Sequence, residues 1–341
     1  MKSLTSICTE NAVGVAILIF AVTFPVFHDG YTVDQFTNFY IACILSFSIM
    51  SIWGYTGIFS FGQAAFFGIG AYVYAIVSLC TDKNLTLPAV LAGILVPFVM
   101  ALIIGYFIFY GGVSEIFTGI ITLCISLVCQ SFMVQTSGPE WKLLGVWLGG
   151  FNGLNNIPKI QLGGFTFSGN SMYFLAVATV FVLYFIFRQL SRSNLGYAMF
   201  SVRESKARSE LFGFRVARIQ TMTFAVSGAL AGLGGVLFAS WSGYVVPSTL
   251  SVDASTVAVV MVAVAGKKNI TGIMLMTIIY SWFTQYLASQ GNQYSNIILG
   301  VILVLAVMFM PEGIMQEIFN RVDRLGLSIR NKIKTFAVSN K

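Results

Sequence analysis

Residues 35–81 read QFTNFYIACILSFSIMSIWGYTGIFSFGQAAFFGIGAYVYAIVSLCT and contain no charged side chain. A helix that crosses a bilayer needs about 20 predominantly apolar residues, so this stretch is long enough for two crossings. A charge at mid-bilayer costs about 2.5 to 3.5 kcal/mol on insertion scales, which makes the distances between charged residues a guide to the spans. We predict spans over residues 37–54 and 62–80, joined by a tight turn at residues 54–57.

The rest of the chain has the same character. Of its 341 residues, 57% are hydrophobic and 9% are charged, against about 25% charged in an ordinary soluble domain. The sequence therefore predicts an all-α membrane protein of about ten transmembrane helices, with a transmembrane domain over residues 1–320 and a basic cytoplasmic tail over residues 321–341. The other predicted spans are residues 11–27, 88–110, 116–134, 172–187, 219–239, a short run between Asp253 and Lys267, 270–288 and 295–311.

The basic residues predict the orientation. Cytoplasmic loops carry an excess of Lys and Arg, and ten spans with both ends in the cytoplasm leave only Lys83, Lys142 and Lys159 of the 19 basic residues outside. Removing any one span would place every later loop on the opposite side of the membrane. The first span lacks a signal-peptide cleavage site and is interpreted as uncleaved. The net charge of +7 is interpreted as an orientation signal and not as a nucleic-acid surface.

The sequence lacks the residues that several kinds of function require. The single histidine, His28, and the five cysteines have no metal-ligand spacing, so we expect no metal site and no membrane enzyme. No predicted span carries the central ionisable residue that proton- and ion-coupled carriers use. The chain also has no Gly-x-x-x-x-Gly-Lys-Ser/Thr loop for ATP. We expect no cofactor in this chain and an energy source outside it.

The most charged segment between spans covers residues 188–218. Within it, Gly213 suits the left-handed residue that ends a helix. Two pairs of opposite charge stand four residues apart and would meet on one helix, Glu204–Arg208 and Lys206–Glu210. A short charged helix with a glycine stop is what a membrane subunit needs to dock on a soluble ATPase, although a basic loop that only sets orientation has a similar composition.

Five stretches resemble one family of membrane proteins. They are IWGYTGIFSFGQAAFFGIGAYVYAI (52–76), GGFNGLNNIP (149–158), GYAMFSVRESKARSELFG (196–213), SGALAGLGGVLFA (227–239) and FMPEGI (309–314). In that order they resemble the glycine-rich signature, the external loop, the coupling segment, the small-residue helix and the closing motif of permease subunits of branched-chain amino acid and urea/amide ABC importers, the LivM-type group.

The resemblance implies an ABC importer permease fold in the bacterial cytoplasmic (inner) membrane, and it implies roles for three groups of residues. ATPase-coupling residues would be Arg203, Glu204, Ala207, Arg208, Glu210 and Gly213. Residues of the translocation pathway, or of tight helix packing, would be Gly54, Tyr55, Gly57, Ser60, Gly62, Gln63, Phe66, Phe67 and Gly70. In the external loop at 135–171, residues that contact a substrate-binding protein or cap the fifth and sixth spans would be Gly149, Gly150, Asn152, Gly153 and Pro158.

The resemblance also implies partners and a mechanism. The partners would be a homologous permease in a heterodimer, two ATP-binding subunits that carry ATP and Mg, an extracytoplasmic substrate-binding protein and the lipid bilayer. This chain would then translocate branched-chain amino acids by alternating access and would not itself be an enzyme. Urea or a short-chain amide stays open as substrate, because Gln63 stands where many amino acid permeases carry His and residues 111–115 and 266–271 depart from the family pattern. A stand-alone secondary transporter or channel is the alternative class.

Topology provides the first test. Reporter fusions or impermeant labels placed within residues 203–213 should report the cytoplasmic side, because the basic segment stays inside. An external location for this segment would contradict both the orientation and the coupling interpretation.

Overall fold

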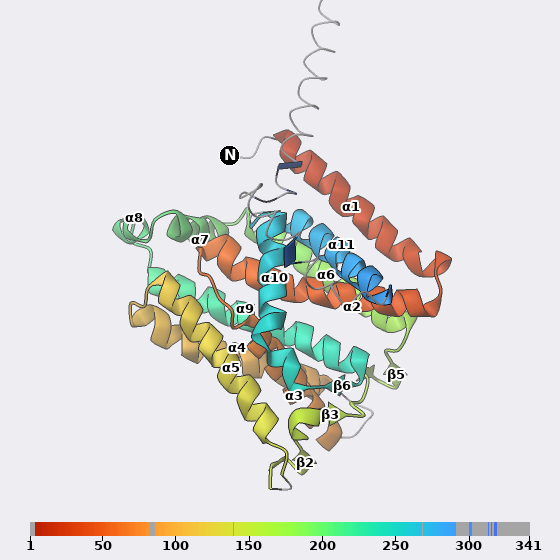
Figure 1. The fold of residues 1–341 in the computed structure, drawn as a ribbon. Coiled ribbons are helices and arrows are strands. Elements are labelled where there is room, and N and C mark those ends of the chain that lie inside the picture. Colours follow the sequence, from red (N-terminus) through yellow and green to blue (C-terminus); the bar gives the residue numbers. More distant parts are fainter. Residues whose placement is uncertain are drawn as a thin grey trace, which may run out of the picture.

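The computed structural model describes residues 4–81, 86–138, 140–267 and 269–290, together with 300–301, 313, 315, 317 and 318. Figure 1 shows a bundle of helices with short strands gathered at one end. The helices are α1 (Leu4–Phe27), α2 (Gly30–Ile49), α3 (Gln63–Cys80), α4 (Leu87–Tyr110), α5 (Glu115–Gln135), α6 (Asn170–Leu190), α7 (Asn194–Glu204), α8 (Lys206–Leu211), α9 (Val216–Ser242), α10 (Val252–Ala265) and α11 (Ile270–Ser289), with a π-helical turn η1 (Met50–Gly54) and 3-10 turns η2 (Gly150–Asn152) and η3 (Pro247–Leu250).

The six strands are two residues long and form three antiparallel pairs. They are β1 (Lys142–Leu143) with β2 (Val146–Trp147), β3 (Leu154–Asn155) with β6 (Tyr244–Val245), and β4 (Gln161–Leu162) with β5 (Phe165–Thr166). In Figure 1 these strands lie at the end of the bundle away from α7 and α8. The charged segment and the loop at 135–171 therefore lie on opposite sides of the bundle.

Seven of the described helices are long and apolar enough to cross a membrane, namely α2 with η1, α3, α4, α5, α6, α9 and α11. Each covers a predicted span, which confirms a mostly helical membrane protein. Two shorter apolar stretches, Val13–Phe27 and Val252–Ala265, coincide with the predicted first and eighth spans. The predicted tenth span at 295–311 lies almost entirely outside the described residues, as does the basic tail at 321–341.

The outer faces of α4 and α5 carry large apolar side chains that the described part of the chain leaves exposed. Exposed examples are Leu95, Phe107, Ile116 and Val128. A contiguous apolar face of this kind marks a membrane or protein interface. On helices of spanning length it is the face expected toward lipid.

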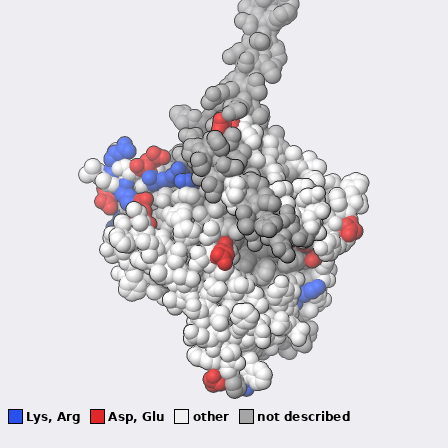
Figure 2. Space-filling model, viewed as in Figure 1, with Lys and Arg blue, Asp and Glu red and all other residues white. Residues whose placement is uncertain are grey.

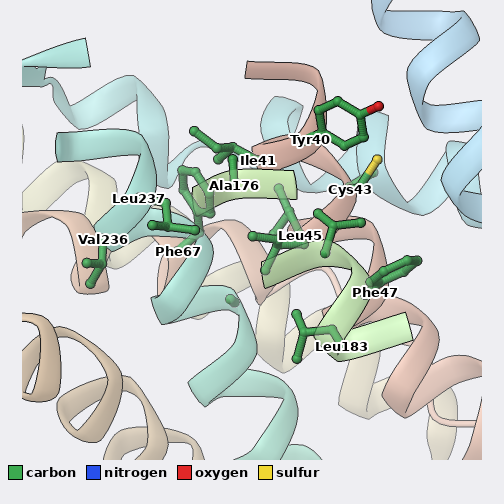
Figure 3. Close-up of a cluster of buried hydrophobic side chains, with 14 of the residues drawn as sticks. Tyr40, Ile41, Cys43, Leu45, Phe47, Phe67, Ala176, Leu183, Val236 and Leu237 are labelled. Carbon is green, nitrogen blue, oxygen red and sulfur yellow. The ribbon is translucent and has the colours of Figure 1, made fainter. Parts of the chain in front are cut away.

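Helix α9 lies at the centre of the bundle, packed against α2, α3 and α4. Figure 3 shows part of the core beside it, with Tyr40 and Phe47 from α2, Phe67 from α3, Leu183 from α6 and Leu237 from α9. Glycines bring the backbones together, since a Cβ at Gly70 would lie 2.5 Å from the Gly232 Cα atom. Such close van der Waals packing holds membrane helices together, because lipid gives no hydrophobic drive for their association.

The predicted tight turn at residues 54–57 is wrong. Helix α2 runs on through the π-helical turn η1 as far as Thr56, and the chain then follows a non-helical path from Gly57 to Gly62. Figure 1 shows this path leaving the level of α7 and descending into the bundle to the start of α3. The crossing that follows α2 is thus a broken one, because it is non-helical from Gly57 to Gly62 and its helical part begins only at Gln63 inside the protein.

Candidate functional site: the charged segment and the broken crossing

The charged segment folds as two short helices at one end of the bundle. Figure 2 shows basic and acidic side chains gathered there, whereas the other charged side chains on this face are scattered. The Ser193 side chain caps α7 by accepting from the Gly196 N–H at 3.2 Å, and the Ser205 side chain caps α8 by accepting from the Arg208 N–H at 3.3 Å. Serine is among the preferred N-cap residues, so the sequence itself specifies both helix starts.

The predicted Glu204–Arg208 pair does not share one helix, because Ser205 is extended and separates α7 from α8. Lys206 and Glu210 do lie together on α8. Glu204 ends α7, whereas Arg208 belongs to α8. The Lys206 ammonium lies 3.1 Å from Glu115 at the start of α5, with both side chains partly exposed. An exposed pair of this kind contributes little stability, but it joins α8 to the membrane bundle.

Gly213 ends α8 as the sequence predicts, with a φ of +84°. The Gly213 N–H donates to the Glu210 carbonyl at 2.9 Å, and the Phe214 N–H donates to the Ser209 carbonyl at 3.1 Å. These two bonds are the Schellman arrangement, which requires a left-handed residue at this position.

Two apolar residues at the tip of α8 were missed by the sequence interpretation. Leu211 is 87% exposed and Phe212 is 79% exposed, although both are large and hydrophobic. Ala207, Arg208 and Glu210 are exposed beside them. The sequence did contain a signal for this exposed apolar tip. Two apolar residues stand just before a helix-ending glycine in a loop that is otherwise charged.

Arg203 connects the charged segment to the broken crossing. Its guanidinium donates to the Gly54 carbonyl at 2.6 Å, at the end of η1. Gly57 adopts a φ of +79° directly against it, so that a Cβ at Gly57 would lie 3.2 Å from Arg203 Cγ. Cations near a helix C-terminus interact favourably with its unpaired carbonyl groups. The end of the interrupted helix is therefore held by a side chain from α7.

Tyr55 makes a second connection at the same point. Its ring stacks on Phe200 of α7 at a centroid distance of 5.0 Å, and its hydroxyl donates to the Phe187 carbonyl of α6 at 2.9 Å. Helices α6 and α7 and the end of η1 are thus fastened together by one aromatic residue that is itself buried.

The turn between α10 and α11 joins this cluster. The Lys267 ammonium lies over the Trp53 ring, 4.2 Å from its centroid, and Gly54 packs directly against the Lys267 carbonyl. Burial lowers the pKa of Lys267, and the nearby Arg203 charge lowers it further. Burial also lowers the pKa of Arg203, while the Glu204 charge raises it. Two partly desolvated cations therefore face one helix end.

The non-helical path has side-chain partners from distant helices. The Phe61 N–H donates to Thr122 Oγ1 at 3.2 Å, and the Ser126 hydroxyl donates to the Phe61 carbonyl at 3.2 Å. The Gly62 N–H donates to Ser60 Oγ at 3.1 Å. Irregular backbone at membrane depth is tolerated only where protein or a water-filled cavity satisfies it.

Gln63 lies where four helices meet and is fully buried. Its amide donates to Ser227 Oγ of α9 at 3.1 Å, and the Ser48 hydroxyl of α2 donates to its carbonyl oxygen at 3.5 Å. The next residue, Ala64, donates its N–H to Ser255 Oγ of α10 at 2.8 Å. The start of α3 is therefore an uncharged polar junction inside the bundle.

The structure places the remaining predicted pathway residues among packed helices. The Phe66 ring meets Phe224 edge-on at 5.6 Å and the Phe67 ring is tilted against Phe238 at 5.6 Å, while Gly70 permits the contact of α3 with α9. These contacts support the packing interpretation for Phe66, Phe67 and Gly70. A role in lining the translocation pathway stays a prediction.

The loop at 135–171, predicted to be external, is fastened to the bundle near its middle. Gly149, Gly150 and Gly153 all have positive φ, and Asn152 lies in the turn η2 between them. The Pro158 carbonyl accepts from the Tyr74 hydroxyl of α3 at 2.8 Å. At the tip, Phe151 is 76% exposed. The cap interpretation and the binding-protein interpretation are both compatible with this shape.

Helices of spanning length, an uncharged interior junction and a charged segment fastened to a broken crossing define a multi-pass helical membrane protein. Comparison with known families identifies it more closely. The chain belongs to the family described as branched-chain amino acid transport system, permease component, whose model matches residues 31–307.

Individual relatives agree with this family. The chain is 25% identical over 327 residues to the high-affinity branched-chain amino acid transport system permease protein LivM of Escherichia coli K12, covering 88% of this chain and 74% of that protein. LivM of Salmonella typhimurium LT2 is also 25% identical, over 88% of this chain and 73% of that protein. BraD of Pseudomonas aeruginosa, a permease protein of the same named system, is 28% identical over 47% of this chain and 55% of its own length. No solved structure matches significantly.

The contact between Arg203 and Gly54 predicts a local dynamic effect. In Arg203→Ala, amide hydrogen exchange in residues 50–57 should accelerate about tenfold, the order expected for losing one hydrogen bond from a charged donor. Exchange measured by mass spectrometry on the purified chain tests this. Arg208→Ala, an exposed arginine on α8, is the matched control and should leave that segment unchanged. Equal exchange in wild type and Arg203→Ala would contradict the fastening role.

Proposed function

We propose that this chain is the membrane permease of an ATP-driven importer in the bacterial cytoplasmic membrane, and that it translocates branched-chain amino acids by alternating access. Family membership supports the transport class, and LivM and BraD are named for branched-chain amino acids. They give no support to urea or an amide as substrate. The observation that carries the mechanism is the bond from Arg203 to the end of η1.

The proposed topology has ten spans with both ends in the cytoplasm. Charged α7 and α8 then face the cytosol, and the loop with strands β1–β5 faces outward. Helix α10 has only 14 residues, about 21 Å at 1.5 Å per residue, and so is shorter than a full hydrocarbon crossing. We count it as a crossing together with η3, which packs against α3 inside the bundle.

The proposed partners follow from the placement of the surfaces. ATP and Mg belong to two separate ATPase subunits, and this chain contributes no catalytic residue. The exposed tip of α8, with Leu211 and Phe212 beside the acidic Glu210, is the surface that we assign to an ATPase groove. A homologous permease completes the translocation pathway as a heterodimer, and an extracytoplasmic binding protein approaches the external loop around Phe151.

Motion reaches the interior through a short chain of contacts. A displacement of α8 by the ATPase moves α7, and Arg203 and Tyr55 carry this displacement to the end of η1. A π-helical turn is a frequent feature of functional sites in helices, and the path from Gly57 to Gly62 lacks the rigidity of a helix. The displacement then arrives at Gln63, where the bonds to α9 and α10 can be remade when α3 tilts.

Reconstitution of the complete complex in liposomes tests the function. We expect leucine uptake that requires hydrolysable ATP and the binding protein, and no comparable uptake of urea. A non-hydrolysable ATP analogue is the control for energy coupling. Uptake by the single chain without ATP would instead establish the stand-alone transporter, and uptake of urea without leucine would overturn the substrate assignment.

The tip of α8 gives a separate prediction. The double variant Leu211→Asp and Phe212→Asp should lower retention of the ATPase subunits about tenfold or more, because burying two carboxylates in an apolar groove is strongly unfavourable. Co-purification measures this. Leu144→Asp makes the same kind of change at an exposed apolar residue on the external side and should retain the ATPase.

Charge reversal tests the acidic residues of the same segment. The variant with Glu204→Lys and Glu210→Lys should lose most of the ATP hydrolysis that the binding protein stimulates. Unchanged stimulation and transport would remove both residues from the coupling surface, even if the apolar tip still binds the ATPase.

A further inference from the structure

Two apolar grooves flank the cytoplasmic end of α9. One, of about 450 Å³, lies between α4 and α9 and includes Tyr106, Phe107 and Tyr110. The other, of about 750 Å³, lies among α6, α7 and α9 and includes Leu190, Leu195 and Phe214. We call them the α4 groove and the α7 groove. Neither belongs to the contacts that link Arg203 to the broken crossing.

Arg218 and Met222 line both grooves. Arg218 is exposed, and no acidic residue lines either groove among the described residues. The two grooves therefore meet at one cation on the first turn of α9. A ligand that fills both must have an anionic head and two apolar branches.

The two tyrosines beside this site indicate a position at the membrane–water boundary, where lipid head groups lie. Tyr106 and Tyr110 are about half exposed, and their rings lie 4.8 Å apart near the end of α4. Tyrosines are enriched at the membrane–water boundary, where the ring is apolar and the hydroxyl is wet. The guanidinium of an arginine matches phosphate geometry and can bond it through two N–H groups.

We propose that Arg218 binds the phosphate of an anionic phospholipid of the cytoplasmic leaflet, whose two acyl chains occupy the α4 groove and the α7 groove. The charge is complementary, because the cytoplasmic leaflet carries anionic lipid that attracts basic residues near its surface. The amide of Asn194, at the start of α7, lines the same groove and provides a polar group for the head. The inference requires the membrane embedding and orientation but is independent of the transported substrate.

The α7 groove also extends to η1 and α7, the two elements proposed to carry motion from the ATPase. Its lining includes Ser51 of η1 and Met199 of α7, which lie on the two elements that Arg203 joins. An acyl chain in this groove packs between the charged segment and the π-helical turn. The bound lipid would thus stabilise the arrangement that transmits motion.

Lipid binding to the purified permease complex tests the proposal. Retained phospholipid is identified by native mass spectrometry, and affinity is measured as the shift of melting temperature when phosphatidylglycerol is added to phosphatidylcholine nanodiscs. Arg218→Ala should weaken phosphatidylglycerol binding about fivefold, the effect of one basic residue near an anionic leaflet. Arg218→Lys should retain most of the binding. Arg215→Ala, an exposed arginine three residues earlier that lines neither groove, should match wild type.

A variant that fills the grooves tests the binding of the acyl chains independently of the head-group contact. Met222→Trp keeps Arg218 but occupies the junction of the grooves, and it should release the retained lipid. Unchanged phosphatidylglycerol binding in both Arg218→Ala and Met222→Trp would overturn the proposal, and so would an equal loss in Arg215→Ala, which would indicate diffuse surface charge. Thiol cross-linking of Phe107→Cys to the partner permease, with no lipid retained, would instead show that the α4 groove is a subunit interface.

Discussion

A helix can be interrupted inside a membrane only where protein or a water-filled cavity satisfies the freed backbone groups, and this constraint shapes the whole broken crossing. The break between Gly57 and Gly62 releases polar groups that lipid cannot satisfy. Thr122 and Ser126 of α5 supply partners for Phe61, and Ser255 of α10 supplies one for the start of α3. Helices α5 and α10, which are far apart in the chain, therefore both bind the backbone between Gly57 and Ala64.

The scarcity of water inside the membrane also explains why the polar junction at Gln63 is uncharged. Gln63, Ser48 and Ser227 can satisfy one another while they carry no net charge, so the junction avoids the large cost of an ion in hydrocarbon. Interhelical bonds of this kind are worth roughly 0.6 kcal/mol on average. Bonds this weak hold a junction in place and can still exchange partners when a helix moves.

The helical spans could be predicted from the sequence because a charge is excluded from each of them. Helices α4, α5 and α11 therefore begin and end within a residue or two of the predicted bounds. The broken crossing could not be predicted in the same way, since Thr122 and Ser255 stand 61 and 191 residues from the groups they bind and resemble ordinary polar residues in apolar runs. In the charged segment, the glycine stop was predicted from a local rule, whereas the break at Ser205 was missed because a regular i, i+4 charge pattern suggested one continuous helix.

The placement of Arg203 follows from the same physics at the membrane boundary. The end of η1 presents carbonyl groups that lack partners within the helix and is therefore a region of negative potential, and the charged segment lies beside it. Arg203 is drawn to this helix end and is only partly desolvated there. Lys267, in the turn between α10 and α11, lies over the Trp53 ring at the same end. Arg203 thus fastens the charged segment to the end of η1, and Lys267 fastens the turn between α10 and α11 to the same end. Charges in these two loops therefore also hold separate helices together.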